Sequence, residues 1–288
     1  MMTTTAVSLV PEQDIAEMSI QLAGFDVYYA DVIENKLMNR GDFDYFASYQ
    51  YNAGVDNDAE YHIASHSIAH KELSNGKTVV IIAIMGTGTE HDGREGPYSS
   101  NGKWQSNLTF KDGNGNYPNG MHYGFKTATD AVLKHLMEDD RDEVHENGDY
   151  GNEIYGDEVG YLDRHGIDPF DSNVIFLITG HSRGAAVGNL LSASLNGMYN
   201  KNRIFSYNYA VPNVVREGEH IGPNPRSAAY NNILNTCNWK DLVTKFPTIS
   251  GPWTRHGEDI MFWGEPTPGV PLGAHRAELY QKWVYSKV

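Results

Sequence analysis

One stretch of this sequence constrains the fold more than any other, because a buried-strand pattern runs directly into two closely spaced glycines. Residues 174–179 are apolar or β-branched on both faces, which is typical of a parallel strand covered on both sides. Gly180-His181-Ser182-Arg183-Gly184 follows at once, and residues 185–195 have the small and apolar side chains of a helix packed on a sheet. The sequence therefore predicts a strand, a sharp turn at Ser182 and a helix, with no loop between them.

Further strands and helices are predicted to alternate along the chain. They are a packing helix at 11–25, a strand at 78–84, a helix at 124–137, strands at 203–209 and 232–236, and a closing helix at 274–284. Alternation of this kind favours a mainly parallel central sheet flanked by helices. Together with the serine turn, it predicts an α/β-hydrolase fold, as a single domain over residues 1–288.

The composition of the chain limits the classes of partner that the protein is expected to bind. The net charge of −15 argues against nucleic acid and against capture by anionic lipid, but not against a neutral ester. No apolar run is long enough for a transmembrane helix, so no stable membrane insertion is expected. The first residues have no basic segment followed by an apolar one, so the sequence as it stands indicates no signal peptide; the location stays open between the cytoplasm and export with a leader removed.

Ser182 is the predicted nucleophile, because the turn between strand and helix exposes its hydroxyl. The helix that follows directs backbone N–H groups at an oxyanion forming beside Ser182. A second donor is expected from the loop after an earlier strand, where Thr87 follows residues 78–84. A simple turn role for Thr87 is the alternative.

A serine nucleophile on this fold needs an acid and then a histidine further along the chain. Asp241 follows a predicted strand directly, whereas the earlier Glu217 and Glu219 lie in a charged segment with no strand before them. His275 is the preferred base, because it opens the closing helix after a loop rich in Pro and Gly. His256, with charged neighbours on both sides, is the alternative base.

Several motifs in this order resemble the class 3 lipases, the fungal-type triacylglycerol lipase family, over about residues 75–285. The similar segments are VVIIAIMGT before Thr87, HYGF at 122–125, ITGHSRGAAVGNLL around Ser182, NWKDLV at 238–243, and His275 with Tyr280. The resemblance implies Ser182 as nucleophile, Asp241 as acid, His275 as base, and Thr87 with the Arg183 N–H as oxyanion donors. It also implies that His256 belongs to a non-catalytic segment. This chain has a single cysteine, Cys237, unlike the disulfide-bonded fungal members.

The resemblance implies a lipase or esterase that cleaves small-molecule or lipid esters. Residues 88–103, near the family's lid, are strongly polar, so we expect weak interfacial activation and a preference for short or medium acyl chains. Trp104, Val211 and Phe246 are candidate substrate-binding residues. A phospholipase A1-type activity and a non-catalytic binding module are the competing functions.

Two other features have plainer interpretations. The acidic stretch 138–163 is interpreted as a solvated surface insertion. His62, His66 and His70 share a face but have no fourth ligand in the pattern, so no metal ion is expected there, and no other cofactor.

Overall fold

The computed structural model describes residues 45–49, 66–86, 111, 114–137, 144–146, 160–247, 252–266, 268–269 and 272–287; in 45–49 and 144–146 it describes the backbone alone. The predicted helix at 11–25, Thr87 and Trp104 lie outside the described residues.

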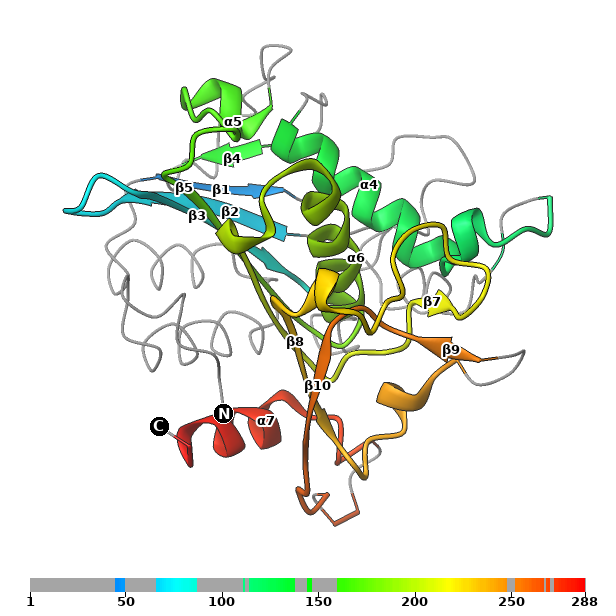
Figure 1. Cartoon of the computed structure of the whole chain (residues 1–288). Helices are drawn as coiled ribbons and strands as arrows, with labels where there is room; N and C mark the ends of the chain where they lie inside the picture. Colours follow the sequence, from blue (N-terminus) through cyan, green and yellow to red (C-terminus); the bar gives the residue numbers. More distant parts are fainter. Residues whose placement is uncertain are drawn as a thin grey trace.

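An eight-stranded sheet forms the centre of the molecule, in the order β10-β8-β6-β5-β3-β2-β1-β4 (Figure 1). Its strands are β1 (Tyr45–Tyr49), β2 (His66–Glu72), β3 (Thr78–Ile84), β4 (Val144–Glu146), β5 (Val174–His181), β6 (Ile204–Tyr209), β8 (Ile233–Asn238) and β10 (Glu258–Phe262). Five of these, β3, β5, β6, β8 and β10, run parallel, and β2, β1 and β4 add an antiparallel edge. The predicted α/β-hydrolase fold with its mainly parallel sheet is confirmed.

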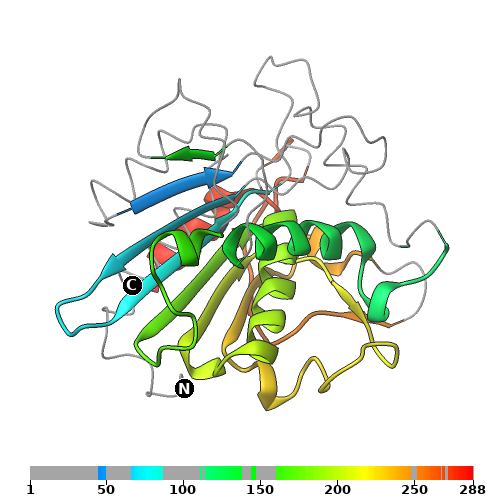
Figure 2. The same ribbon diagram turned by 90° about the horizontal axis from the view of Figure 1, so that it is seen from above.

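Helices cover both faces of this sheet. On one face lie α4 (Tyr123–Met137), α5 (Tyr161–Arg164) and α6 (Arg183–Met198), and on the other lies α7 (Ala277–Tyr285) (Figures 1 and 2). A small second sheet pairs β7 (Val215–Arg216) with β9 (Trp253–Thr254), and short 3-10 helices lie at 118–120, 201–203, 228–230 and 243–245. Within the described residues, no helix is long and apolar enough to span a membrane.

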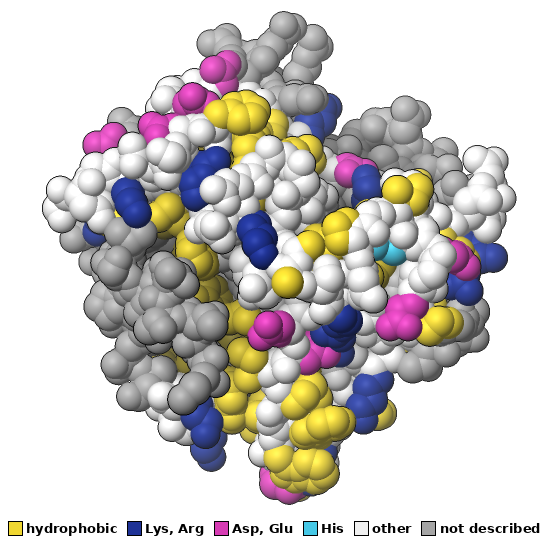
Figure 3. Space-filling view, viewed as in Figure 1, with side chains coloured by type: hydrophobic (Ala, Val, Ile, Leu, Met, Phe, Trp, Pro, Cys, Tyr) yellow, Lys and Arg dark blue, Asp and Glu magenta, His cyan; other side chains and the backbone are white. Residues whose placement is uncertain are grey.

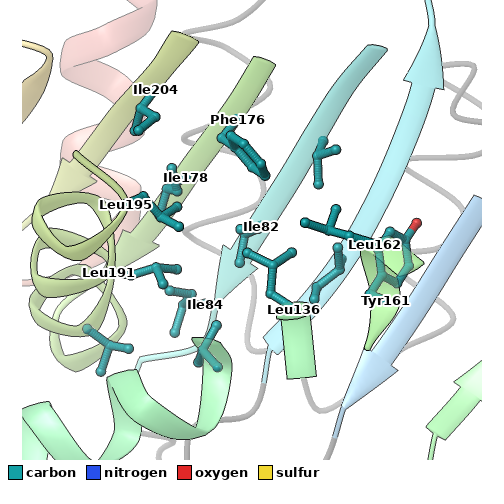
Figure 4. Close-up of a cluster of buried hydrophobic side chains, with 14 of the residues drawn as sticks. Ile82, Ile84, Leu136, Tyr161, Leu162, Phe176, Ile178, Leu191, Leu195 and Ile204 are labelled. Atoms are coloured by element: carbon teal, nitrogen blue, oxygen red, sulfur yellow. The ribbon is translucent and has the colours of Figure 1, made fainter. Parts of the chain in front are cut away.

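The main core lies between the sheet and the helices α4 and α6 (Figure 4). Ile82, Phe176 and Ile178 extend from the strands toward Leu136 of α4 and Leu191 of α6, and all five side chains are buried. These are the residues whose two-sided apolar pattern predicted β3 and β5, since a parallel strand between two helical layers has no solvent-facing side.

The acidic segment 138–163 departs from the predicted surface insertion at two places. Its residues 144–146 form β4, which pairs with β1 at the edge of the sheet. Tyr161 and Leu162 of α5 are buried in the main core. The apolar pair at the end of the stretch thus belongs to the core, and a surface insertion stays a prediction for the rest of it.

Candidate active site

Ser182 lies at a sharp turn between β5 and α6. Its backbone angles, φ 58° and ψ −124°, are strained for a residue with a side chain. The turn is held on both sides, because the Ser182 N–H donates to the Tyr209 carbonyl (2.9 Å) and the Ser182 carbonyl accepts from the Ala186 N–H (3.1 Å). The strand, turn and helix predicted around this serine are therefore present.

The two glycines of the pentapeptide are required by close backbone contacts. A Cβ on Gly180 would overlap the backbone of Gly184, and a Cβ on Gly184 would overlap the carbonyl oxygen of Ile84 in β3. The start of α6 thus lies against the ends of β3 and β5. This is why only glycine fits at these two positions.

Ser182, His275 and Asp241 form a continuous hydrogen-bonded line. The Ser182 Oγ and His275 Nε2 atoms are 2.7 Å apart, and His275 Nδ1 and Asp241 Oδ2 are also 2.7 Å apart. Asp241 is buried, and the side chain of His275 is 13% exposed. The three residues come from the ends of β5 and β8 and from the segment before α7, and the fold brings them together.

The Asp241 carboxylate is fully satisfied by donors. Its Oδ1 accepts the Val243 N–H at 2.9 Å, and its Oδ2 accepts the Tyr280 hydroxyl at 2.7 Å in addition to His275. A buried carboxylate is tolerated only with such partners. They fix the oxygen that receives the His275 Nδ1–H, and so fix the ring orientation.

His275 lies before the closing helix and not on it. The predicted helix at 274–284 begins only at Ala277, because Arg276 has an extended backbone (φ −64°, ψ 137°). His275 belongs to a turn instead, in which its N–H donates to the Leu272 carbonyl at 2.7 Å. The sequence prediction missed this break, since neither Arg276 nor Ala277 disfavours a helix.

His256, the alternative base, is directed elsewhere. Its Nδ1 lies 3.1 Å from Asn189 Oδ1 of α6, and its Nε2 lies 3.4 Å from His220 Nε2. Since an amide oxygen can only accept, Nδ1 carries the proton. Burial and the neighbouring His220 lower the pKa of His256 to about 3. Both ring nitrogens face structural partners and not Ser182.

The expected oxyanion region lies between α6 and the end of β3. Arg183 is the first residue of α6, and burial of its side chain lowers the guanidinium pKa to about 10. Gly86, which precedes Thr87, is described: a Cβ there would lie 2.9 Å from the His181 carbonyl and 3.6 Å from the Ser182 Cβ. The chain therefore passes beside Ser182 immediately before Thr87.

The predicted substrate-binding residues have different environments. Val211 is fully buried against Ala185 and Cys237, and its substrate contact stays a prediction. It follows β6 and faces the helix layer, which the sequence pattern did not reveal. Phe246 is partly buried, its carbonyl accepts the Asn213 N–H at 2.7 Å, and its substrate contact stays a prediction.

Four large apolar side chains are exposed close in sequence to the acid and the base. These are Trp239, Leu242, Trp263 and Leu272, each about half to two-thirds exposed. The Trp239 N–H donates to the carbonyl of Phe262 at 2.9 Å, which places Trp239 and Trp263 at neighbouring strand ends. Figure 3 shows apolar side chains gathered at the lower tip, where β8 and β10 end. We call these four residues the apolar rim.

Sequence reasoning gave no role to Tyr280 beyond a family likeness, and none to His181. Tyr280 contacts Asp241 across 39 positions, and His181 contacts the backbone of His275 across 94. Neither has a local pattern that marks it. Tyr280 reaches the site only because α7 packs against the sheet, whereas His181 lies there as the neighbour of Ser182.

Comparison with known proteins gives a family match over part of the chain and solved structures of similar fold. Residues 121–251 match the family described as Lipase (class 3). Solved structures with the same fold include M37 lipase (13% identity, TM-score 0.55, covering 96% of this chain and 92% of that one) and Rhizomucor miehei triacylglyceride lipase (16%, 0.52, 88% and 81%). The lipase of Rhizopus microsporus var. chinensis is also similar (14%, 0.52, 92% and 80%). No curated protein matches the chain in sequence.

The family match and the fold define a carboxylic-ester hydrolase of the α/β-hydrolase type. Within that class, residues 121–251 are similar to the class 3 lipases.

Proposed function

We propose that this protein hydrolyses acyl esters through an acyl-enzyme formed on Ser182. The observation that carries the proposal is the line from Ser182 Oγ through His275 to Asp241, with 2.7 Å at each step, at a strained turn between strand and helix. Geometry of this kind allows one imidazole to take the serine proton and return it to the leaving alcohol.

In the first half of the reaction, Ser182 Oγ attacks the ester carbonyl carbon while His275 Nε2 takes the hydroxyl proton. Asp241 stabilises the imidazolium that forms. The N–H of Arg183 at the start of α6, with Thr87 as the proposed second donor, stabilises the oxyanion. The intermediate collapses as His275 gives its proton to the alcohol. Water, activated by the same imidazole, then releases the acid and restores Ser182.

For the substrate, we propose esters with short to medium acyl chains. The polarity of residues 88–103 supports this, because an oil-binding lid needs an apolar face. The apolar rim supplies exposed apolar contact area from residues close in sequence to Asp241 and His275. It suits an acyl chain or the surface of a small ester aggregate.

A panel of p-nitrophenyl esters from acetate to palmitate tests both parts of the proposal. Turnover is expected to peak at the butyrate or octanoate ester, and Ser182→Ala should lose about 10³-fold or more in kcat/KM on every ester. Equal hydrolysis by wild type and Ser182→Ala would sink the mechanism. A peak at palmitate, a steep rise in rate above the solubility limit of a triglyceride, or faster cleavage of phosphatidylcholine than of any of these esters would overturn the substrate class.

His256 provides a matched control for the assignment of His275 as the base. His275→Ala should lower kcat by several orders of magnitude, whereas His256→Ala, which removes contacts to Asn189 and His220, should act mainly on stability. The opposite pattern in kcat would make His256 the base.

A further inference from the structure

His181 is the last residue of β5 and precedes Ser182 directly. Its side chain contacts Tyr280 of α7 and so lies on the sheet face opposite to the one on which Gly180 meets α6. There its ring is 4.9 Å from the ring of His275 and 5.8 Å from that of Tyr280, measured between centroids. It is therefore packed between the proposed base and the tyrosine that supports the acid.

His181 makes a hydrogen bond through its ring, and the acceptor determines which ring nitrogen carries the proton. Its Nε2 lies 2.9 Å from the backbone carbonyl oxygen of His275. Since a carbonyl oxygen only accepts, the Nε2–H of His181 must donate, and this sets the tautomer of the ring.

We infer that His181 is a positioning residue for the proposed base. Its Nε2–H holds the backbone of His275 in place, and this fixes the distance between His275 Nε2 and Ser182 Oγ. The inference rests on the proposed function, because it concerns the base of that same mechanism.

The need for such a contact follows from where His275 lies. It sits in a turn between Leu272 and Arg276, outside α7, so no helical hydrogen bond fixes its carbonyl. His181 and Ser182 are consecutive residues at the end of one sheet strand. The strand end that carries the nucleophile thus also carries the group that locates the base. A displacement of about 1 Å between reacting groups can cost about 100-fold in rate.

The charge state of His181 suits this role. Burial, and then the neighbouring His275 ring, lower the pKa of His181 to about 3, whereas the hydrogen bond to the His275 carbonyl, Asp241 and Glu278 act in the opposite direction. A neutral ring beside His275 does not oppose the imidazolium that the base becomes during acylation. A charged group in the same place would oppose it.

Two amide substitutions separate positioning from packing. In His181→Gln the amide nitrogen is three bonds from Cβ, as Nε2 is in histidine, so the donor still reaches the His275 carbonyl. In His181→Asn the amide nitrogen is one bond short. We expect His181→Asn to lower kcat for p-nitrophenyl butyrate by about 10- to 100-fold with little change in KM, and His181→Gln to stay within about 3-fold of wild type. The fall of kcat at low pH should be the same in His181→Gln as in wild type, because one neutral hydrogen-bond donor replaces another.

Rates should be expressed per active site, titrated with a p-nitrophenyl phosphonate, and melting temperatures measured by circular dichroism. Equal kcat in the two variants, a change confined to KM, or failure of both variants to fold would each overturn the inference. The failure of the proposed function looks different: Ser182→Ala would then hydrolyse the ester as fast as wild type, whatever His181 does.

Discussion

Asp241 is the most deeply buried of the three hydrogen-bonded residues, with 1% of its surface exposed. Its two oxygens accept from a backbone N–H, a tyrosine hydroxyl and the proposed base. The donors differ in what they do. Val243 and Tyr280 hold the carboxylate, and the carboxylate in turn holds the tautomer of His275. Loss of the acid should therefore cost far more than loss of one of its supports.

Two substitutions compare the loss of the acid with the loss of one of its hydrogen-bond donors. Asp241→Asn presents an amide that can donate to His275 Nδ1, which favours the wrong tautomer, so kcat should fall about 10³- to 10⁴-fold. Tyr280→Phe removes one hydrogen bond to a charged group and should cost about 10-fold. Steady-state kinetics with p-nitrophenyl butyrate measure both. A loss under 10-fold for Asp241→Asn, or equal losses for the two variants, would contradict this ranking.

At the scale of elements, the close packing of α6 against the sheet decides where Ser182 lies. Gly184 meets β3, and Gly188 meets β6, where a Cβ would lie 2.6 Å from Asn208 Oδ1. The side of α6 that faces the strands therefore has almost no side-chain volume at these two positions. A helix with ordinary side chains there would move away from the strand ends and take the Arg183 N–H with it.

Gly184→Ala and Gly197→Ala test this packing within one helix. The alanine at 184 would overlap the Ile84 carbonyl and should destabilise the protein by about 3 kcal/mol or more. The alanine at 197 would meet nothing within 4 Å and should stabilise it by about 0.5–1 kcal/mol through helix propensity. Urea unfolding gives both free energies. Similar changes from the two variants would show that the contact with β3 is not what requires glycine.

The elements were predictable from the sequence to different degrees, for physical reasons. Strands β3 and β5 were clear because they are buried on both faces, and the turn at Ser182 was clear because it needs two glycines at fixed spacing. Strand β10 was missed, since this edge strand begins with Glu258 and Asp259 and its apolar run is only Ile260 to Phe262. The contacts of His181 and Tyr280 could not be predicted, because they arise only when α7 packs on the sheet.

At the scale of the whole molecule, the buried histidines link stability to pH. The pKa of His256 is lowered to about 3, with burial as the largest cause, while an unfolded histidine titrates near 6.5. Below that value the unfolded chain binds a proton that the folded protein does not. The stability contributed by neutral His256 is thus complete above about pH 6.5 and is lost progressively as the pH falls toward 3.

His256→Asn keeps an amide donor at the reach of Nδ1 and removes the titrating ring. Between pH 7 and pH 5, the free energy of unfolding of wild type should fall by about 2 kcal/mol more than that of this variant. Urea titrations at the two pH values measure the difference. If both proteins lose stability in parallel, His256 is not neutral in the folded state or does not titrate on unfolding.

Covalent labelling of the intact protein with a fluorophosphonate, followed by peptide mass spectrometry, shows directly whether Ser182 is an activated nucleophile. Such reagents react with a serine hydroxyl activated by a neighbouring base. One adduct is expected, on Ser182, formed rapidly in wild type and at least about 10³-fold more slowly in His275→Ala. An adduct on another serine, or equal labelling rates in the two proteins, would contradict the proposed mechanism.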